Sequence, residues 1–354
     1  MSGTALNLTG DLVELTSTLV DIESVSGHEQ EIADAVEAAL RVVPWLDVWR
    51  HENSIVARTH LGRAERVVIA GHLDTVPVND NLRARTDGRL LHGLGSCDMK
   101  GGVAVALAIA AGVPAPNRDL TFVLYECEEI EAERNGITRI AATRPELLAG
   151  DFAVVMEPSN AVVEAGCQGS ITVAVSTVGK RAHAARSWNG VNAIHGVEGV
   201  LARLTSYQPR RPIVDGLAFH EGLNAVGISG GVAGNVVPDR CTVTVNHRFA
   251  PDRSVPEAEA HLRQVFDGYD VEVLDSASAA APGLDRPAAA AFVAAVGGRV
   301  NPKFGWTDVA RFSELGVPAV NFGPGDPELA HHRDENVPLE HLRYCLETMR
   351  AWLT

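Results

Sequence analysis

Two stretches near the start of the chain carry hydrophobic residues at helical spacing. Leu12, Leu15 and Leu19 recur every three or four positions after Asp11, and a second set at 32, 36, 40 and 43 follows a glycine. Such spacing places the apolar side chains on one face of an α-helix. We therefore expect an amphipathic helix at 12–19 and another at 32–43.

Short continuous apolar runs come next, at 67–70, 120–125 and 152–156, and an alanine- and valine-rich stretch at 103–111 separates the first two. Buried strands alternating with helices are typical of an α/β sheet, and a further strand at 317–322 and a closing helix at 339–352 continue this character. Polar residues follow each run directly. In open α/β sheets, ligand-binding and catalytic groups gather beyond the carboxyl ends of the strands.

The pattern changes to period two from about residue 171, most clearly in CTVTVNHRF at 241–249. This alternation predicts antiparallel strands, and helical patterns at 194–204 and 256–266 accompany them before a loose stretch at 275–287. We predict an α/β protein with a discontinuous mixed-sheet domain of residues 1–176 and 287–354. A smaller α+β domain of residues 177–286 would be inserted into it.

Composition narrows the range of partners. With 46% hydrophobic and 21% charged residues, the chain is an ordinary globular protein. Thirty basic residues against 45 acidic ones give a formal charge of −15, which argues against nucleic acid or an anionic membrane as a partner. The longest apolar run, 103–113, is too short to cross a bilayer, and no signal-peptide pattern begins the chain.

The cysteines indicate where the protein works. There are five, an odd number, they are widely spaced, and none forms a C-x-x-C pair. This pattern predicts neither a disulfide framework nor a cysteine-rich zinc site. We therefore expect a protein of the reducing cytoplasm.

The first polar group at a strand end is His72, with Asp74 two residues later. Residues two apart on an extended chain point the same way, so the Asp74 carboxylate could accept the N–H of one ring nitrogen and leave the other free for a metal. The alternative is a strand-end histidine beside a turn aspartate.

Asp98 lies in GLGSCDMKGG, directly before the alanine- and valine-rich stretch. A glycine-bounded loop that opens a helix could bind phosphate, but neither G-x-G-x-x-G nor G-K-[ST] is present, so nucleotide binding is not expected. A carboxylate in this position can instead hold a cation.

Glu128 and Glu129 follow the second strand. Adjacent glutamates leave the chain in different directions, so one could bind metal while the other handles a proton. Carboxylates this close repel each other unless a cation compensates them. The alternative is a solvated acidic loop.

Glu157 follows the third strand, and His331 and His332 stand in AHHRDE near the C-terminus. No H-E-x-x-H motif occurs, which excludes the common single-zinc protease plan. Two imidazoles and three carboxylates without a thiolate suit two zinc ions that share one carboxylate and keep open positions. The candidate ligands are His72, Asp98, Glu129, Glu157 and His331.

The ordered motifs GHLDTVP, GSCDMKGG, CEE, MEPS and AHHRDE, with GKRAHAARSWNGVNAI between the last two, resemble the di-zinc deacylases and carboxypeptidases of the aminoacylase and acetylornithine deacetylase family. Within that family, EAGCQGS, GVAGNVVPD and FGWTDVARF are most similar to the succinyl-diaminopimelate desuccinylases of actinobacteria. The chain departs from the usual pattern at Cys127, where many relatives carry aspartate, and at Leu94, which replaces a frequent arginine.

The resemblance implies a role for each candidate. Glu128 would be the general base and Asp74 would orient His72. His331 rather than His332 would bind metal, because the family pattern places a glutamate four residues later, and Glu335 stands there. The implied ligands are His72 and Glu157 for one zinc ion, Glu129 and His331 for the other, and Asp98 for both, with cobalt(II) as a substitute metal.

The resemblance also makes the inserted domain a lid and dimerisation domain of a homodimer. His183 in KRAHAAR would reach the partner's active site and donate to the oxyanion. The alternative is a surface histidine among basic residues. Asn235, Arg248 and Thr307 match positions that contact substrate, although Arg248 could equally be a surface strand residue.

The implied reaction hydrolyses N-succinyl-LL-2,6-diaminopimelate to succinate and LL-2,6-diaminopimelate, for lysine and diaminopimelate synthesis, through a zinc-bridged hydroxide and Glu128. A related deacylase of small N-acyl amino acids such as N-acetylornithine, or a small-peptide metallo-carboxypeptidase, would share the same ligands. A non-catalytic metal-stabilised protein is a third alternative. Glu128 beside a full ligand set argues against it.

Overall fold

The computed structural model describes residues 4–354, which fold into two compact units. Unit 1 comprises the described residues up to 165, together with 283–301 and 307–354. Unit 2 comprises 166–282 and 302–306, and is thus an insertion in the sequence of unit 1. The predicted domain boundaries at 176/177 and 286/287 lie further along the chain and stay a prediction.

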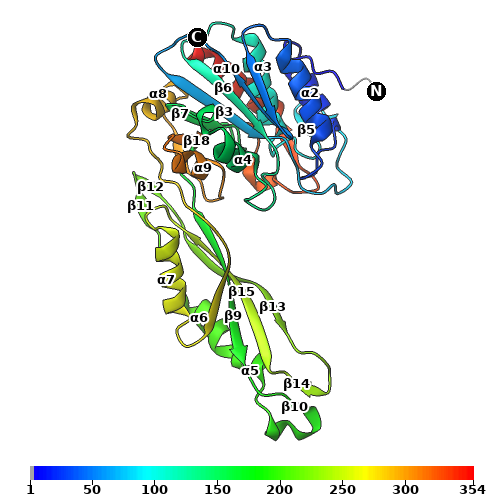
Figure 1. Cartoon of the computed structure of the whole chain (residues 1–354), viewed down its shortest axis with the longest axis vertical. Coiled ribbons are helices and arrows are strands. Elements are labelled where there is room, and N and C mark those ends of the chain that lie inside the picture. Colours follow the sequence, from blue (N-terminus) through cyan, green and yellow to red (C-terminus); the bar gives the residue numbers. More distant parts are fainter. Residues whose placement is uncertain (1–3) are drawn as a thin grey trace. The chain divides into compact units, whose positions relative to one another are not determined.

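A mixed sheet lies at the centre of unit 1, with the strand order β1-β2-β6-β3-β7-β18-β8-β17 (Figure 1). Strands β6, β3, β7 and β18 are parallel neighbours, whereas β1, β2 and β8 are antiparallel to theirs. The carboxyl ends of the predicted strands therefore meet at one edge, as expected. The strands are β1 Asp47–His51, β2 Ser54–Arg58, β3 Arg66–His72, β6 Asp119–Tyr125, β7 Phe152–Val155, β8 Val163–Ala165, β17 Val300–Pro302 and β18 Ala319–Asn321, with a small sheet of β4 Arg85–Thr86, β5 Leu90–His92 and β19 Asn336–Pro338.

Helix α3 is the buried helix of unit 1. It is apolar on all sides because it packs against β3 and also against α1 and α10. Gly102 allows this close packing, since a Cβ atom there would lie 2.1 Å from the carbonyl oxygen of Met156. The helices are α1 Leu12–Asp21, α2 Gln30–Arg41, α3 Lys100–Gly112, α4 Gly136–Thr143, α8 Pro287–Ala295, α9 Val309–Glu314 and α10 Leu339–Leu353, with 3-10 turns η1 Pro145–Leu147 and η3 Pro327–Leu329.

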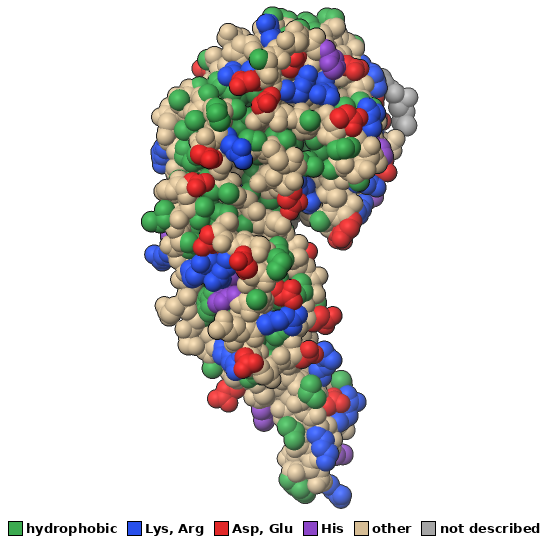
Figure 2. Space-filling view, turned by 60° about the vertical axis from the view of Figure 1, so that its left-hand side comes forward, with side chains coloured by type: hydrophobic (Ala, Val, Ile, Leu, Met, Phe, Trp, Pro, Cys, Tyr) green, Lys and Arg blue, Asp and Glu red, His purple; other side chains and the backbone are tan. Residues whose placement is uncertain are grey.

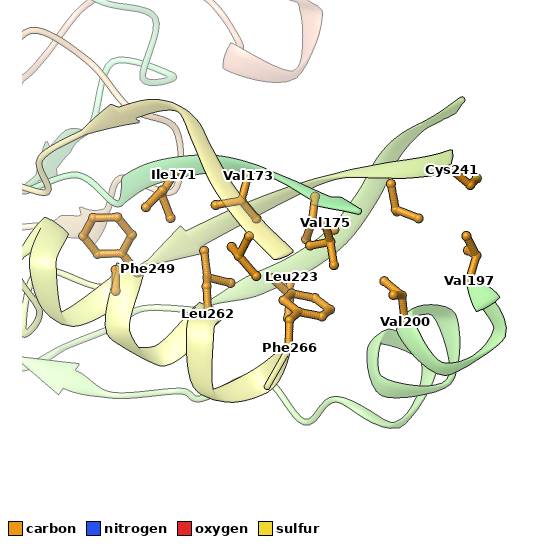
Figure 3. Packing of buried hydrophobic residues seen from close by; sticks show 14 of the residues in the cluster. Ile171, Val173, Val175, Val197, Val200, Leu223, Cys241, Phe249, Leu262 and Phe266 are labelled. Carbon is orange, nitrogen blue, oxygen red and sulfur yellow. The ribbon is translucent and has the colours of Figure 1, made fainter. Parts of the chain in front are cut away.

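Unit 2 is built on an antiparallel sheet of order β13-β15-β9-β16. Its apolar face packs against helices in a core that includes Ile171, Val173, Val175 and Phe249 (Figure 3). The predicted alternation in 241–249 is confirmed, because every second side chain from Cys241 onward is buried. The elements are β9 Gly169–Val178, β10 Ala182–His183, β11 Ile213–Val214, β12 Leu217–Ala218, β13 Gly222–Gly230, β14 Val236–Val237, β15 Arg240–Phe249, β16 Asp270–Ala277, η2 Ala184–Asn189, α5 Ala193–Gly196, α6 Glu198–Ser206 and α7 Val255–Val265.

The predicted fold class, a mixed-sheet domain with a smaller inserted α+β domain, is confirmed. Three local predictions differ from the structure. The hairpin of β1 and β2 was not expected, the helical pattern at 194–204 is divided between α5 and α6, and the loose stretch from 275 begins as the last part of β16.

The helices and the cysteines of residues 4–354 bear on two further predictions. None of the helices there combines the length and the apolar character needed to cross a membrane. All five cysteines are buried, and no disulfide joins any of them.

Candidate active site

His72 is the last residue of β3 and is 1% exposed. Its Nδ1 atom lies 3.1 Å from the backbone carbonyl oxygen of Asp74 and 3.5 Å from that residue's Oδ1. The carbonyl oxygen is the nearer acceptor, and the carboxylate that the spacing suggested also interacts with the ring. With Nδ1–H donating, Nε2 faces Asp98 Oδ1 at 3.0 Å and Glu157 Oε1 at 4.0 Å.

The acid groups around His72 change its pKa. Burial by itself lowers the pKa of an imidazole, but the hydrogen bonds and charges of Asp74 and Asp98 outweigh burial and raise the pKa of His72 well above its ordinary value. His72 therefore lies in a strongly negative field, which favours a positive charge at its Nε2 atom.

Asp98 occupies the turn before α3, and its peptide bond to Met99 is cis. Its two carboxylate oxygens face different imidazoles, with Oδ1 3.0 Å from His72 Nε2 and Oδ2 3.4 Å from His331 Nε2. Burial opposes ionisation, but the hydrogen bonds from His331 and His72 lower the pKa of Asp98. This carboxylate is placed between the two histidines, where a shared ligand would stand.

Glu335 fixes the turn that carries Asp98. Its Oε1 atom accepts the backbone N–H groups of Cys97 and Asp98, both at 2.9 Å, and its Oε2 atom accepts that of Gly95 at 3.1 Å. Glu335 is buried, and burial raises the pKa of its carboxyl group to about 7 against these three bonds, which favour the ionised form. One side chain therefore ties the loop after His331 to the loop of Asp98.

The turn after β6 presents Glu128 and Glu129. Their backbone N–H groups donate to Asp74 Oδ1 at 3.0 Å and Asp74 Oδ2 at 3.1 Å, and Ser26 Oγ donates to the same Oδ2 at 2.7 Å. The buried Asp74 carboxylate thus holds the two glutamates in place through their backbone. Sequence spacing had assigned it only to His72.

Cys127 gives this turn its shape. It has φ of 57°, in the left-handed region that non-glycine residues rarely adopt. Glu29 Oε1 accepts both its N–H at 3.2 Å and its S–H at 3.3 Å. Three successive N–H groups, from Cys127 to Glu129, therefore bond to two buried carboxylates.

His331 closes the second half of the site. It lies on the loop after η3 with φ of 64°, and its Nε2 atom is 2.9 Å from Glu129 Oε1. The hydrogen bonds to Asp98 and Glu129 raise the pKa of this half-exposed imidazole to about 10. His332 is exposed.

The structure brings all five candidate ligands together in two groups that share Asp98. His72, Asp98 and Glu157 form one group, and Asp98, Glu129 and His331 form the other; within each, one potential ligand atom per residue lies within 4.8 Å of the others. Imidazole nitrogens mixed with carboxylate oxygens are the ligands that zinc and similar divalent cations take. The donor set therefore fits a pair of cations, and the role of each residue stays a proposal.

Glu128 lies beside both groups. Burial raises the pKa of its carboxyl well above its ordinary value, and the charges of Asp308, Glu157 and Glu129 add to this effect against the opposing charge of His72. A carboxyl group with a raised pKa is a stronger base than an ordinary glutamate, as a proton carrier requires. Cations bound by the neighbouring groups would offset the repulsion among these acids.

No pattern in the sequence pointed to two residues of this site, Ser26 and Glu29. Both stand on the loop between α1 and α2, about 45 residues before His72, and neither belongs to a run of chemically suggestive residues. Glu335 entered only as a marker that distinguished His331 from His332. Their roles depend on contacts between distant segments, which spacing along the chain does not reveal.

The predicted residues of unit 2 fall at two ends of its sheet. His183 lies on β10, which pairs with β14 beside Asn235, and the Asn235 carbonyl oxygen accepts the N–H of Ala184 at 2.8 Å. Arg248 lies near the far end of β15, opposite Ser170 of β9. The structure thus brings His183 and Asn235 together, but places Arg248 apart from them (Figure 1).

His183 is exposed and its ring is oriented locally. The Nδ1 atom accepts the backbone N–H of Ala185 at 3.0 Å. In the neutral ring, the hydrogen must then be on Nε2, which makes this exposed atom a donor. Lys and Arg side chains gather at this end of unit 2 (Figure 2), where Arg181 pairs with Asp239.

Thr307 belongs to unit 1, before α9. It is buried, and its hydroxyl group donates to Oδ1 of Asn321 at 3.0 Å. Asn321 is the last residue of β18.

Known proteins resemble this chain along its whole length. Residues 68–354 match the peptidase family M20/M25/M40. The chain belongs to this family. The family resemblance predicted from the ordered motifs is therefore confirmed.

Two relatives within the family are similar enough to compare directly. The chain is 52% identical to the DapE protein of Mycobacterium tuberculosis over 98% of this chain and 99% of that one. It is 43% identical to the succinyl-diaminopimelate desuccinylase of Corynebacterium glutamicum over 99% and 98% of the two chains.

Solved structures of other proteins share the fold at much lower identity. A tripeptidase from Staphylococcus aureus is 21% identical and matches with a TM-score of 0.79 over 98% of both chains. An M20 family metallo-carboxypeptidase from Sulfolobus solfataricus is 14% identical and has the same TM-score over 97% and 98%. The fold is thus shared by proteins that differ widely in sequence.

Proposed function

We propose that the protein is a metal-dependent succinyl-diaminopimelate desuccinylase. It hydrolyses N-succinyl-LL-2,6-diaminopimelate to succinate and LL-2,6-diaminopimelate for diaminopimelate and lysine synthesis. The observation that carries this proposal is the pair of ligand groups sharing Asp98 beside Glu128, in a chain 43% identical to a desuccinylase over nearly its full length.

The residues that would hold the metals are those of the two groups. His72 and Glu157 would bind one zinc ion, Glu129 and His331 the other, and Asp98 both, with cobalt(II) as a substitute. When bound, such a pair of divalent cations polarises an amide carbonyl and lowers the pKa of water. Asp74 positions this set through the backbone of Glu128 and Glu129.

Glu128 is the proton carrier of the proposed reaction. Its carboxylate accepts a proton from the attacking water as the new C–O bond forms, and then delivers that proton to the amine nitrogen as the C–N bond breaks. The raised pKa that burial and neighbouring acids give Glu128 suits both steps. No covalent link between enzyme and substrate is needed.

His183 acts across a homodimer in this proposal, where its Nε2–H donates to the oxyanion in the partner's site. The bond from Ala185 to Nδ1 supports this role because it keeps the donor on Nε2. Edge strand β13 supports dimerisation. It pairs only with β15 among the described strands, and it exposes 63% of Val226 and 60% of Ile228.

Asn235, Arg248 and Thr307 are the proposed substrate-binding residues. The substrate is a small N-acyl amino acid with several carboxylates, and an arginine side chain recognises a carboxylate through two parallel hydrogen bonds. The free thiol state of the buried cysteines described above fits a protein of the reducing cytoplasm, where we propose it works.

The proposed reaction is tested by steady-state hydrolysis of N-succinyl-LL-diaminopimelate and of N-acetylornithine by the zinc-loaded protein. We expect a strong preference for the succinyl substrate and loss of turnover in Glu128→Gln, which keeps the shape of the side chain and removes its proton acceptor. Preference for N-acetylornithine would instead identify an acetyl deacylase. Turnover of neither substrate by protein with two bound metals would reject both reactions.

The trans role of His183 is tested by mixing two inactive homodimers. Subunits of His183→Ala and Glu128→Ala together should regain part of the activity, because a mixed dimer holds one site with both groups intact. No recovery in verified mixed dimers would place His183 in its own subunit's site or outside catalysis.

A further inference from the structure

The sheet of unit 2 has one polar face, opposite the apolar core shown in Figure 3. On β15, the side chains of Thr242, Thr244, Asn246 and Arg248 alternate with buried ones and lie on this second face. The paired residues of β9 on the same face include Ser170 and Thr172. A half-buried arginine therefore lies among hydroxyl and amide groups, and the acid on this face whose charge reaches it is Asp275 of β16, the partner of Thr172.

Asn246 holds Arg248 in one orientation. Arg248 Nε donates to Asn246 Oδ1 at 3.2 Å, and Asn246 Nδ2 donates to Ser170 Oγ and Thr172 Oγ1, both at 3.0 Å. A guanidinium group can only donate, so the amide oxygen must be the atom that faces it. The two hydroxyl groups on β9 then fix the amide nitrogen, and the whole chain of bonds has a single direction.

Arg248 keeps its charge available. Within residues 4–354 it forms no ion pair, and burial lowers the pKa of its guanidinium although the charge of Asp275 acts against this. Its cross-strand neighbour on β13 is Gly222, which has no side chain to fill the space beside it. A partly desolvated cation with no bound carboxylate is costly unless a ligand supplies the anion.

We propose that Asn246 is a positioning residue that prepares Arg248 for a carboxylate of the substrate. It binds Nε with a neutral oxygen, which orients the guanidinium without neutralising it, and so leaves the two Nη groups for a bidentate bond to the ligand. An acidic residue at 246 would orient Arg248 equally well but would occupy its charge. The inference rests on the substrate-binding role proposed for Arg248, and it adds selectivity for carboxylate-bearing substrates.

Asn246→Asp is the decisive variant, because it replaces only the NH2 group of the amide with an oxygen. The hydroxyl groups of Ser170 and Thr172 can rotate and donate to this oxygen, so the hydrogen bonds to β9 are kept. We expect KM for N-succinyl-LL-diaminopimelate to rise at least about tenfold while kcat changes less than about threefold. Thr244→Asp is the matched control: it adds the same charge to the same face about 7 Å further along the strand, and should keep the wild-type KM.

Two further measurements separate positioning from a general charge effect. In an Arg248→Lys background, which has no Nε–H for Asn246 to hold, Asn246→Asp should add little to the change in KM. The proposal is overturned if the full effect of Asn246→Asp on KM persists in that background. It is also overturned if Asn246→Asp has the wild-type KM and an unchanged melting temperature.

A binding experiment keeps this inference distinct from the proposed reaction. Succinate titrated calorimetrically into the metal-loaded protein should bind wild type and Thr244→Asp alike, and Asn246→Asp at least about tenfold more weakly. If wild type hydrolyses no succinyl substrate but this difference appears, the proposed reaction fails and the carboxylate site stands. If wild type hydrolyses the substrate and all three proteins bind succinate and turn over alike, only the inference about Asn246 fails.

Discussion

The carboxylate of Glu335 accepts the backbone N–H group of Asp98 at 2.9 Å. Glu335 follows His331 by four residues, so one buried side chain joins the two loops that supply these candidate ligands. The site is therefore built from pairs of loops held by buried carboxylates, Glu335 for one pair and Asp74 for another.

Glu335→Gln should weaken metal binding. The glutamine amide keeps one acceptor oxygen, but its NH2 group would face a backbone N–H group that the second carboxylate oxygen binds in the wild type. Loss of a group that orients a metal ligand typically lowers metal affinity by about 10–100-fold. Competition with a chelator measures the change. The exposed Glu340→Gln serves as control, and equal affinity in both variants would contradict the role given to Glu335.

Asp74→Asn should abolish most activity and lower metal affinity together. Asp74 accepts the backbone N–H groups of both Glu128 and Glu129. The NH2 group of an asparagine would face at least one of these N–H donors, and would therefore displace the proposed base and a candidate ligand together. Turnover and metal content are measured on the same preparation. Asp80→Asn, at a position whose side chain is 82% exposed, should behave as wild type.

Cys127→Val should lower the melting temperature more than Cys345→Val. Both cysteines are buried, but only Cys127 has a positive φ, which a β-branched residue tolerates poorly. We expect an extra loss of about 1–3 kcal/mol at residue 127. Cys127→Asn should lose less, because asparagine accepts this conformation and can donate to Glu29; a similar loss in all three variants would show that the backbone there carries no such constraint.

The stability of unit 2 should fall on acidification because of His247. Burial lowers the pKa of this imidazole and outweighs the bond to the Gly222 carbonyl group and the charge of Glu221, which raise it, while the charges of Arg253 and Arg210 add to the lowering. The unfolded chain therefore takes up a proton first as pH falls below about 6.5, so the stability contributed by neutral His247 is complete above that pH and is lost toward its lower folded pKa.

This dependence is measured as the free energy of unfolding at about pH 7.5 and about pH 5.5. His247→Asn can keep the bond that Nδ1 makes to the Gly222 carbonyl, and it should lose less stability between the two values than wild type. The exposed His60→Asn should lose as much as wild type. An equal loss in all three proteins would assign the dependence to other groups.

Ile228→Asp should convert the proposed dimer to monomers. The side chain is 60% exposed on edge strand β13, and a charge there opposes pairing with a second copy. Sedimentation gives the mass, and activity should fall with it if His183 acts in trans. Leu274→Asp on β16, at the other edge of the sheet and 52% exposed, is the matched control and should remain dimeric.

Local sequence patterns were enough to predict the α/β class, the inserted second unit and the candidate ligands. It could do so because hydrophobic periodicity is local, and because His72, Glu129 and Glu157 each follow a buried strand whose carboxyl end lies at a common edge. Sheet geometry then brings such residues together whatever the rest of the chain does.

The contacts that hold these residues in place depend on the folded arrangement of distant segments. Ser26, Glu29 and Glu335 act through hydrogen bonds to segments 48 to 240 residues away, as the separations of the bonded pairs record. The same holds for Asp74, whose carboxylate serves Glu128 and Glu129 more directly than His72, and for Asn246, whose neutral amide leaves Arg248 charged. Hydrogen-bond partners are chosen by proximity and direction in the folded chain, and neither quantity is written in the spacing of residues along it.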